Sequence, residues 1–138
     1  MQRFTPGLIL AFFLSFPGFA SAQSDGLDWA SLAEVDTVQV LTVNEDTRLL
    51  DTTVWLVVVD DRGYIRTGGT AWGDNVVRDP EIEISIEGTT YPVTVRFVED
   101  EGLRQRITDT FREKYGFIDS VIGLFRGDRP KLMGLTAR

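Results

Sequence analysis

The clearest pattern in the chain is a strict alternation of apolar and polar residues between positions 81 and 97. The apolar residues share one face of an extended chain, before and after a Gly88-Thr89 pair that is typical of a tight turn. This pattern predicts a β-hairpin whose two strands bury the same face, because a slip by one residue would expose every apolar side chain. A two-residue turn at Gly88-Thr89 predicts four cross-strand pairs: Ile86 with Tyr91, Ile84 with Val93, Ile82 with Val95, and Glu81 with Arg96.

A continuous apolar run, Val54-Trp55-Leu56-Val57-Val58-Val59, differs from this hairpin because no polar residue alternates with it. The run predicts a strand covered on both faces, such as the central strand of a small closed barrel or of a sheet under helices. The following Asp60-Asp61-Arg62-Gly63 predicts a turn in which Gly63 takes a positive φ, with residues 64–67 as the returning strand. This second hairpin leads directly into a glycine-rich loop at residues 68–73.

Two further strands are predicted from weaker patterns. Residues 35–43 predict a first strand with Val38, Val40 and Leu41 in the interior, and residues 131–136 predict a closing strand. The polar N-terminal arm, residues 23–36, carries a short amphipathic patch in which Trp29 is expected to plug the core.

Helical patterns lie in the second half of the chain. A helix is predicted to open at Glu99-Asp100-Glu101, whose acids match the positive end of the helix dipole, and to end at Gly116. Residues 73–80 predict one helical turn, which Pro80 ends, and the spacing of residues 117–125 predicts another helix. In the long helix the expected buried residues are Leu103, Ile107, Phe111 and Tyr115, and the expected solvent-facing residues are Arg104, Arg106, Arg112, Glu113 and Lys114.

The first 22 residues have the pattern of a cleavable signal peptide. Arg3 precedes an apolar core at residues 8–16, and Ala20-Ser21-Ala22 forms a small-residue cleavage site before Gln23. A retained membrane anchor is the alternative, and the short apolar run, interrupted by Pro17-Gly18, disfavours it. We therefore expect a Sec-type signal peptide at 1–22, an arm at 23–36, one domain at 37–138, and a periplasmic or secreted location.

Composition excludes several classes of function. The chain has 14 basic and 21 acidic residues, and removal of Arg3 with the signal leaves 13 against 21, a net charge of −8. Nucleic acid and anionic membranes are therefore poor partners. The chain contains neither cysteine nor histidine, which removes disulfides, thiolate catalysis, the Ser-His-Asp arrangement and the usual zinc and haem ligands. Glu81, Glu83 and Glu87 share one strand face, and we interpret them as a solvated face and not as a metal site.

The most site-like segment is the glycine-rich loop and the strand that enters it. Arg66 can chelate two oxygens of an anion, Thr67 and Thr70 can donate hydrogen bonds, and the paired glycines allow backbone N–H groups to approach closely. Trp72 offers a flat ring for stacking. The alternative is structural: the loop crosses a barrel end, Trp72 plugs it, and Arg66 pairs with an acid. No phosphate-loop or dinucleotide signature is present.

Four ordered segments, VWLVVVDDRGYIRTGGTAW, NVVRDP, EIEISIEGTTYPVTVRF and FREKYGFID, together resemble an uncharacterised bacterial family of the FMN-binding split β-barrel superfamily. This superfamily includes pyridoxamine-phosphate oxidases and deazaflavin-dependent nitroreductases, and the resemblance covers residues 37–138. It implies a homodimer with a flavin-type cofactor between two barrels. It also implies that Arg66, Thr67 and Thr70, with Arg78 nearby, hold the cofactor phosphate.

Together, pattern and resemblance predict a six-stranded split β-barrel with one or two packed helices, and the alternative is an α+β sandwich with an open sheet. Three functions stay open: a reductase that uses a flavin (FMN) or a deazaflavin, a non-catalytic module that binds a small anionic or aromatic ligand, and a structural domain with a filled cleft.

Overall fold

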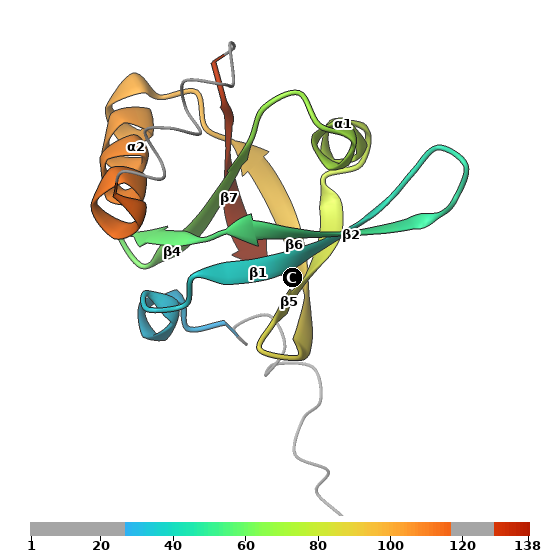
Figure 1. Cartoon of the computed structure of the whole chain (residues 1–138), viewed down its shortest axis with the longest axis horizontal. Helices are drawn as coiled ribbons and strands as arrows, with labels where there is room; N and C mark the ends of the chain where they lie inside the picture. The colour runs from blue at the N-terminus through green and yellow to red at the C-terminus, as the bar shows by residue number, and fades with distance from the viewer. Residues whose placement is uncertain (1–26, 117–128) are drawn as a thin grey trace, which may run out of the picture.

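The computed structural model describes residues 27–116 and 129–138. The predicted signal peptide and the apolar set at 117–125 therefore lie outside the described residues. Within the described part, one antiparallel sheet curls around a core, with helices at its sides (Figure 1). In chain order the elements are η1 (Trp29–Leu32), β1 (Thr37–Val43), β2 (Leu49–Trp55), β3 (Val57–Val59), β4 (Arg62–Thr67), α1 (Ala71–Arg78), β5 (Glu81–Ile86), β6 (Thr89–Phe97), α2 (Glu101–Tyr115) and β7 (Lys131–Ala137).

The strand order is β2-β1-β5-β6-β7-β4-β3, so β2 and β3 form the two ends of the sheet. The apolar run 54–59 belongs to both, because it divides at Leu56. The prediction of a central strand was therefore wrong, and this division gives seven strands in place of six. The prediction that both faces are covered is confirmed: Val54, Leu56 and Val58 pack in the barrel core, and the alternate residues pack under α2.

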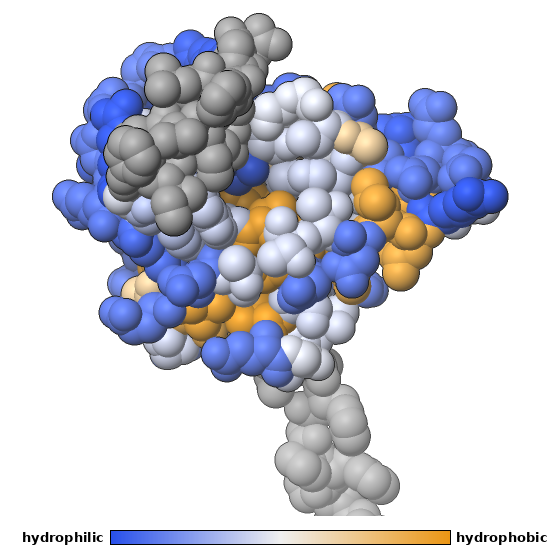
Figure 2. All heavy atoms as spheres, in the orientation of Figure 1, coloured by the Kyte–Doolittle hydropathy of each residue, from blue (hydrophilic) through white to orange (hydrophobic). Residues whose placement is uncertain are grey.

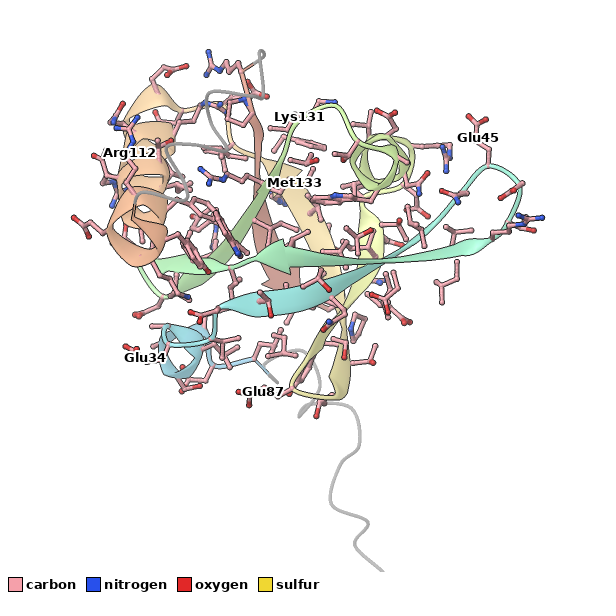
Figure 3. The ribbon with its side chains drawn as sticks, viewed as in Figure 1. Glu34, Glu45, Glu87, Arg112, Lys131 and Met133 are labelled. Carbon is pink, nitrogen blue, oxygen red and sulfur yellow. The ribbon has the colours of Figure 1, made fainter. Side chains whose placement is uncertain are left out.

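Two apolar clusters stabilise the fold. The larger one fills the inside of the curled sheet and includes Met133 (Figure 3). Val38, Ile84 and the predicted plug Trp29, which is 8% exposed, belong to the same cluster. The smaller one lies between the sheet and α2 and is centred on Ile107 and Phe111, both fully buried. On β1, Thr42 takes the third inward position and Leu41 is only half-buried. Mainly β structure with flanking helices is thus confirmed.

The 81–97 hairpin forms as predicted, but its turn lies one residue earlier, which shifts each cross-strand partner by two residues. Ile86 pairs with Thr89 and Ile84 with Tyr91, so the turn residues are Glu87 and Gly88. Both have positive φ, 49° and 87°, as a two-residue hairpin turn of this hand requires, and a β-branched residue such as Thr89 cannot take such a φ without strain. The shift by two residues preserves the buried face and is the reason why the predicted pairs were wrong.

Glu81 consequently lies opposite Thr94 and not opposite Arg96. Arg96 pairs with Gly134 of β7. The partner of the Glu81 carboxylate is Arg138, with 3.6 Å between the charged atoms. This ion pair joins two segments that are far apart in the sequence.

The β3–β4 turn is formed by Asp60 and Asp61, with φ values of 50° and 59°. The prediction that Gly63 takes a positive φ was wrong, because Gly63 lies within β4. It is a glycine for another reason: a Cβ there would lie 2.3 Å from a ring carbon of Trp29. The plug and the strand therefore contact each other at a distance that only glycine permits.

Helix α2 begins at a capping residue, since the Asp100 side chain accepts a hydrogen bond from the Leu103 backbone N–H, and it ends at Gly116 with a φ of 61°. Arg104 and Lys114 do not face solvent as predicted. Arg104 donates hydrogen bonds to the carbonyls of Val98 and Pro130. Arg112 does point outward (Figure 3). Across residues 27–116 and 129–138, no helix has the length and apolar character needed to cross a membrane.

Candidate functional site

A pocket of about 440 Å³ lies between the edge of β2 and the end of β4. Strand β3 pairs only with residues 62–64 of β4, so the last three residues of β4 have β7 as their one paired neighbour. The sheet therefore stays open along β2 at this point, and we call this opening the split. The residues that line the pocket are Thr52, Thr53, Val54, Trp55, Arg66, Thr67, Gly68, Gly69, Thr70 and Trp72.

Four of the five predicted site residues thus share one pocket. Among the residues that the structure describes, Arg66 is the one charged residue that lines the pocket. The guanidinium carbon of Arg66 lies 4.0 Å from the centre of the Phe111 ring, a cation–π contact with helix α2. The half-buried side chain is therefore held against an aromatic face beside the pocket.

Thr67 and Thr70 shape the loop that leads into α1. Thr70 is the N-cap of that helix, and its hydroxyl oxygen accepts a hydrogen bond of 3.1 Å from the Gly73 backbone N–H. Thr67 is 3% exposed, and its hydroxyl forms a hydrogen bond with the Thr70 hydroxyl. A Cβ on Gly73 would lie 2.8 Å from the Thr67 methyl group. These hydroxyls therefore fix the loop, and they direct the positive end of α1 toward the pocket.

Trp72 forms the base of the pocket. Its side chain is 5% exposed and packs in the barrel core, so little of its ring surface is open for stacking. Trp55, which is half-buried, lines the same pocket from β2. Sequence reasoning assigned Trp55 to a covered strand and missed it as a pocket residue, together with Thr52 and Thr53. The only signal that could have found these three residues was the edge position of β2, and that position depends on the strand order.

Arg78 lies at the opposite end of the eight-residue helix α1, about 12 Å away at 1.5 Å per residue. Its guanidinium donates to the Val43 carbonyl at 2.8 Å and to the Asn75 side-chain oxygen at 2.9 Å. Asn75 is buried and also donates to Thr42 and Asn44 on and after β1. Within the single chain, Arg78 therefore links α1 to β1 and lines a separate depression. It does not line the pocket that contains Arg66.

The aromatic side chains behind the pocket form a continuous stack. The rings of Trp55 and Tyr115 are parallel within 5°, with centroids 4.3 Å apart, and Tyr115 lies 6.0 Å from Phe111. The Tyr115 hydroxyl lies 2.6 Å from the carbonyl oxygens of both Asp36 and Leu56. Burial raises the pKa of Tyr115 to about 12, so this hydroxyl stays protonated at neutral pH.

Lys114 contacts the same segment of chain from α2. Its ammonium group donates to the carbonyls of Val35 and Leu56. Burial lowers the pKa of Lys114, and the nearby acids Asp36 and Glu34 oppose that shift. Both ionisable groups at the end of α2 therefore hold the backbone at the division between β2 and β3.

A protein-family model described as "Uncharacterized protein conserved in bacteria (DUF2255)" matches residues 28–129. The chain belongs to this family. The comparison with curated proteins finds no match. The family assignment covers both the pocket and helix α2.

Comparison with solved structures identifies the fold of this chain. HutZ, the haem storage protein from Vibrio cholerae, matches with a TM-score of 0.63 and 19% identity over 76% of this chain and 83% of that one. A candidate pyridoxamine 5′-phosphate oxidase from Listeria innocua matches with a TM-score of 0.59 and 13% identity, covering 79% and 89%. A FAD-binding protein from Mesorhizobium loti matches with a TM-score of 0.54 and 7% identity, covering 80% and 87%. At these identities the likeness shows the fold, and the predicted split β-barrel is confirmed.

Proposed function

We propose that this protein binds a flavin or deazaflavin-type ligand in the pocket at the split. The observation that carries the proposal is a pocket of about 440 Å³ that combines one cationic residue, Arg66, with threonine hydroxyls and the ring of Trp55. Its volume lies in the range of small-molecule sites, about 300–1,000 Å³. Similarity to a FAD-binding protein and to a candidate pyridoxamine 5′-phosphate oxidase supports the same ligand class.

Each wall has a role in the proposed complex. Arg66 supplies the charge-assisted contact to a phosphate or another anionic group, and the start of α1 adds backbone N–H groups of the same polarity. Trp55 replaces Trp72 as the expected stacking surface, because Trp72 is buried beneath the pocket. A bound flavin supplies hydride or electron transfer, and the chain contributes binding, orientation and exclusion of water.

Haem fits the residues present less well, although HutZ is described as a haem storage protein. The chain contains no histidine or cysteine. The described pocket lining also contains no tyrosine, methionine or lysine, so it offers none of the usual axial ligands. We therefore favour a ligand held by ionic and stacking contacts over one held by coordination.

The lining also bears on the choice between enzyme and binding module. It includes no Asp, Glu, Lys or Tyr among the described residues, so none of the described lining side chains is suited to general acid or base catalysis at neutral pH. A reductase would thus rely wholly on its cofactor. A non-catalytic binding module is the second candidate, and reoxidation of a chemically reduced, bound flavin by a nitroaromatic compound distinguishes the two.

The binding test titrates FMN, riboflavin and a deazaflavin into purified protein, with tryptophan fluorescence and melting temperature as readouts. Loss of a charged contact costs about 2–3 kcal/mol, so Arg66→Ala is expected to weaken FMN binding about thirtyfold or more. Arg62→Ala is the matched control, because Arg62 is an exposed arginine on the same strand. Equal affinities for the two variants, or no ligand-induced change in the wild type, would refute the proposal.

Thr70 needs a different control because it has a structural role. Thr70→Ala removes the N-cap of α1 and is expected to cost about 1 kcal/mol of stability as well as several-fold in affinity. A loop residue is expected to carry little of the core, so loss of its side chain would leave the fold intact, and the capping hydrogen bond corrects that expectation for Thr70. Thr70→Ser keeps the hydroxyl, so it should retain most of both properties.

We also infer export and homodimerisation, each on separate grounds. Export rests on the signal-like sequence at 1–22. Expression of the full gene should yield a protein whose intact mass corresponds to a chain that begins near Gln23. Homodimerisation rests on the resemblance to split-barrel dimers. It also fits the projecting β1–β2 hairpin, on which Val43 and Leu49 are 53% and 68% exposed (Figures 1 and 2). A monomeric mass by light scattering at high concentration would count against it.

A further inference from the structure

Helix α2 contacts two residues that line the pocket, Arg66 and Trp55. Arg66 comes from β4 and Trp55 from the end of β2, strands that are not paired with each other. Behind them, Phe111 and Tyr115 occupy successive turns of α2. The guanidinium lies over Phe111, and the indole stacks on Tyr115.

The order of contacts is therefore Trp55, Tyr115, Phe111, Arg66, from one wall to the other through the helix. Neither Phe111 nor Tyr115 lines the pocket. Phe111 is fully buried, so it would have no direct contact with a ligand. Any effect of these two residues on binding must act through the side chains they support.

The helix itself is tied to both sides of the split. At its C-terminal end, Tyr115 and Lys114 bond the backbone at Leu56, where the chain passes from β2 to β3. At its N-terminal end, Arg104 bonds the carbonyl of Pro130, next to the start of β7, which pairs with β4. Helix α2 can therefore hold the two walls at a fixed separation.

Positioning of this kind matters most for arginine. A free arginine side chain has many rotamers, and restricting them on binding carries an entropic cost. A contact that holds the guanidinium before the ligand arrives removes part of that cost, which is the general benefit of preorganisation. Trp55 gains in the same way, because stacking on Tyr115 holds the indole ring in one orientation.

We propose that Phe111 and Tyr115 are positioning residues, which hold Arg66 and Trp55 in place for a ligand in the split. The proposal rests on the proposed binding function for its effect on affinity. The geometry of Arg66 itself is testable without any ligand.

The ligand-free test uses the NMR signal of the Arg66 Nε–Hε group, assigned by its loss in Arg66→Lys. A ring 4.0 Å from the guanidinium carbon is expected to move this signal upfield through its ring current. Phe111→Leu should abolish that displacement. Ile107→Ala is the control, since Ile107 is buried in the same cluster one turn earlier and its truncation loosens the same helix. An Arg66 signal that does not change in Phe111→Leu would overturn the proposal.

The binding test uses FMN with the same variants. Phe111→Leu and Tyr115→Leu are each expected to weaken binding about fivefold or more, whereas Tyr115→Phe keeps the stack and should stay within about twofold of the wild type. Ile107→Ala should bind like the wild type despite its lower melting temperature. Equal loss of affinity in Ile107→Ala and Phe111→Leu would show general loosening and overturn the inference. Wild-type protein that binds none of FMN, riboflavin and a deazaflavin would refute the proposed function, and the Arg66 signal would still decide whether Phe111 positions Arg66.

Discussion

The contact between Gly63 and Trp29 makes a sharp quantitative prediction for Gly63→Ala. The added Cβ would lie 2.3 and 2.4 Å from two carbons of the indole ring. Carbon atoms pack at about 3.5–4.0 Å, so the ring would have to withdraw by more than 1 Å. Strand β4 is paired on both sides at this position, with β3 and β7, and we therefore expect Trp29 to move and not the strand.

The magnitude follows from what Trp29 loses. A buried tryptophan covers about 150–250 Å², worth about 4–6 kcal/mol at 25 cal/mol per Å², and this sets the upper limit if the ring leaves its site completely. Overpacking that the surroundings partly absorb costs about 1–3 kcal/mol. We expect Gly63→Ala to lower the free energy of unfolding by about 2–4 kcal/mol.

A double-mutant cycle tests the cause. In a Trp29→Leu background the obstructing ring atoms are gone, so Gly63→Ala should become neutral or stabilising by about 0.5–1 kcal/mol, the usual gain when alanine replaces glycine in a strand. Urea unfolding followed by circular dichroism is the assay, because fluorescence changes when Trp29 is removed. A Gly63→Ala cost that is the same in both backgrounds would refute the clash with Trp29.

Three further predictions concern other parts of the fold. Glu87→Asn should raise the free energy of unfolding by about 0.5–1 kcal/mol in urea titrations, because asparagine tolerates the positive φ that the turn imposes, and a loss of stability would contradict the assigned turn. Asn75→Ala should lower it by about 2–3 kcal/mol, because the buried Thr42 hydroxyl and Arg78 lose a partner, and an effect below about 0.5 kcal/mol would mean that the network contributes little. In alkaline absorbance titrations at 295 nm, one phenolate should form near pH 12 in the wild type and be missing in Tyr115→Phe. Because the folded pKa of Tyr115 is raised, stability from its protonated form is complete below about pH 10 and declines as the pH rises toward 12. A Tyr115 that ionises near pH 10, its ordinary value, would disprove its burial.

The sequence by itself determined the elements whose signals are local. The alternation at 81–97 defined the buried face of the hairpin, and the four-residue repeat from Leu103 to Tyr115, with Asp100 before it and Gly116 after it, defined helix α2. Part of the candidate site could also be predicted from residues that are close together in the sequence. Arg66, Thr67, Thr70 and Trp72 lie within seven residues, so any fold that places this loop at an opening brings them together.

Tertiary structure alone decided the neighbours of each element. Periodicity states which face of a strand is buried, but it carries no information on which strand lies beside it. The run 54–59 therefore read as one central strand, although it divides at Leu56 between the two ends of the sheet. The same pairing exposed Trp55 to the pocket. Arg78 lies outside that pocket because residues 71–78 form a helix, which places Arg78 at the end opposite Thr70. The stack that joins Trp55 to Arg66 through α2 depends on contacts across 45 to 60 residues of sequence, and such contacts form only when the barrel closes around its core.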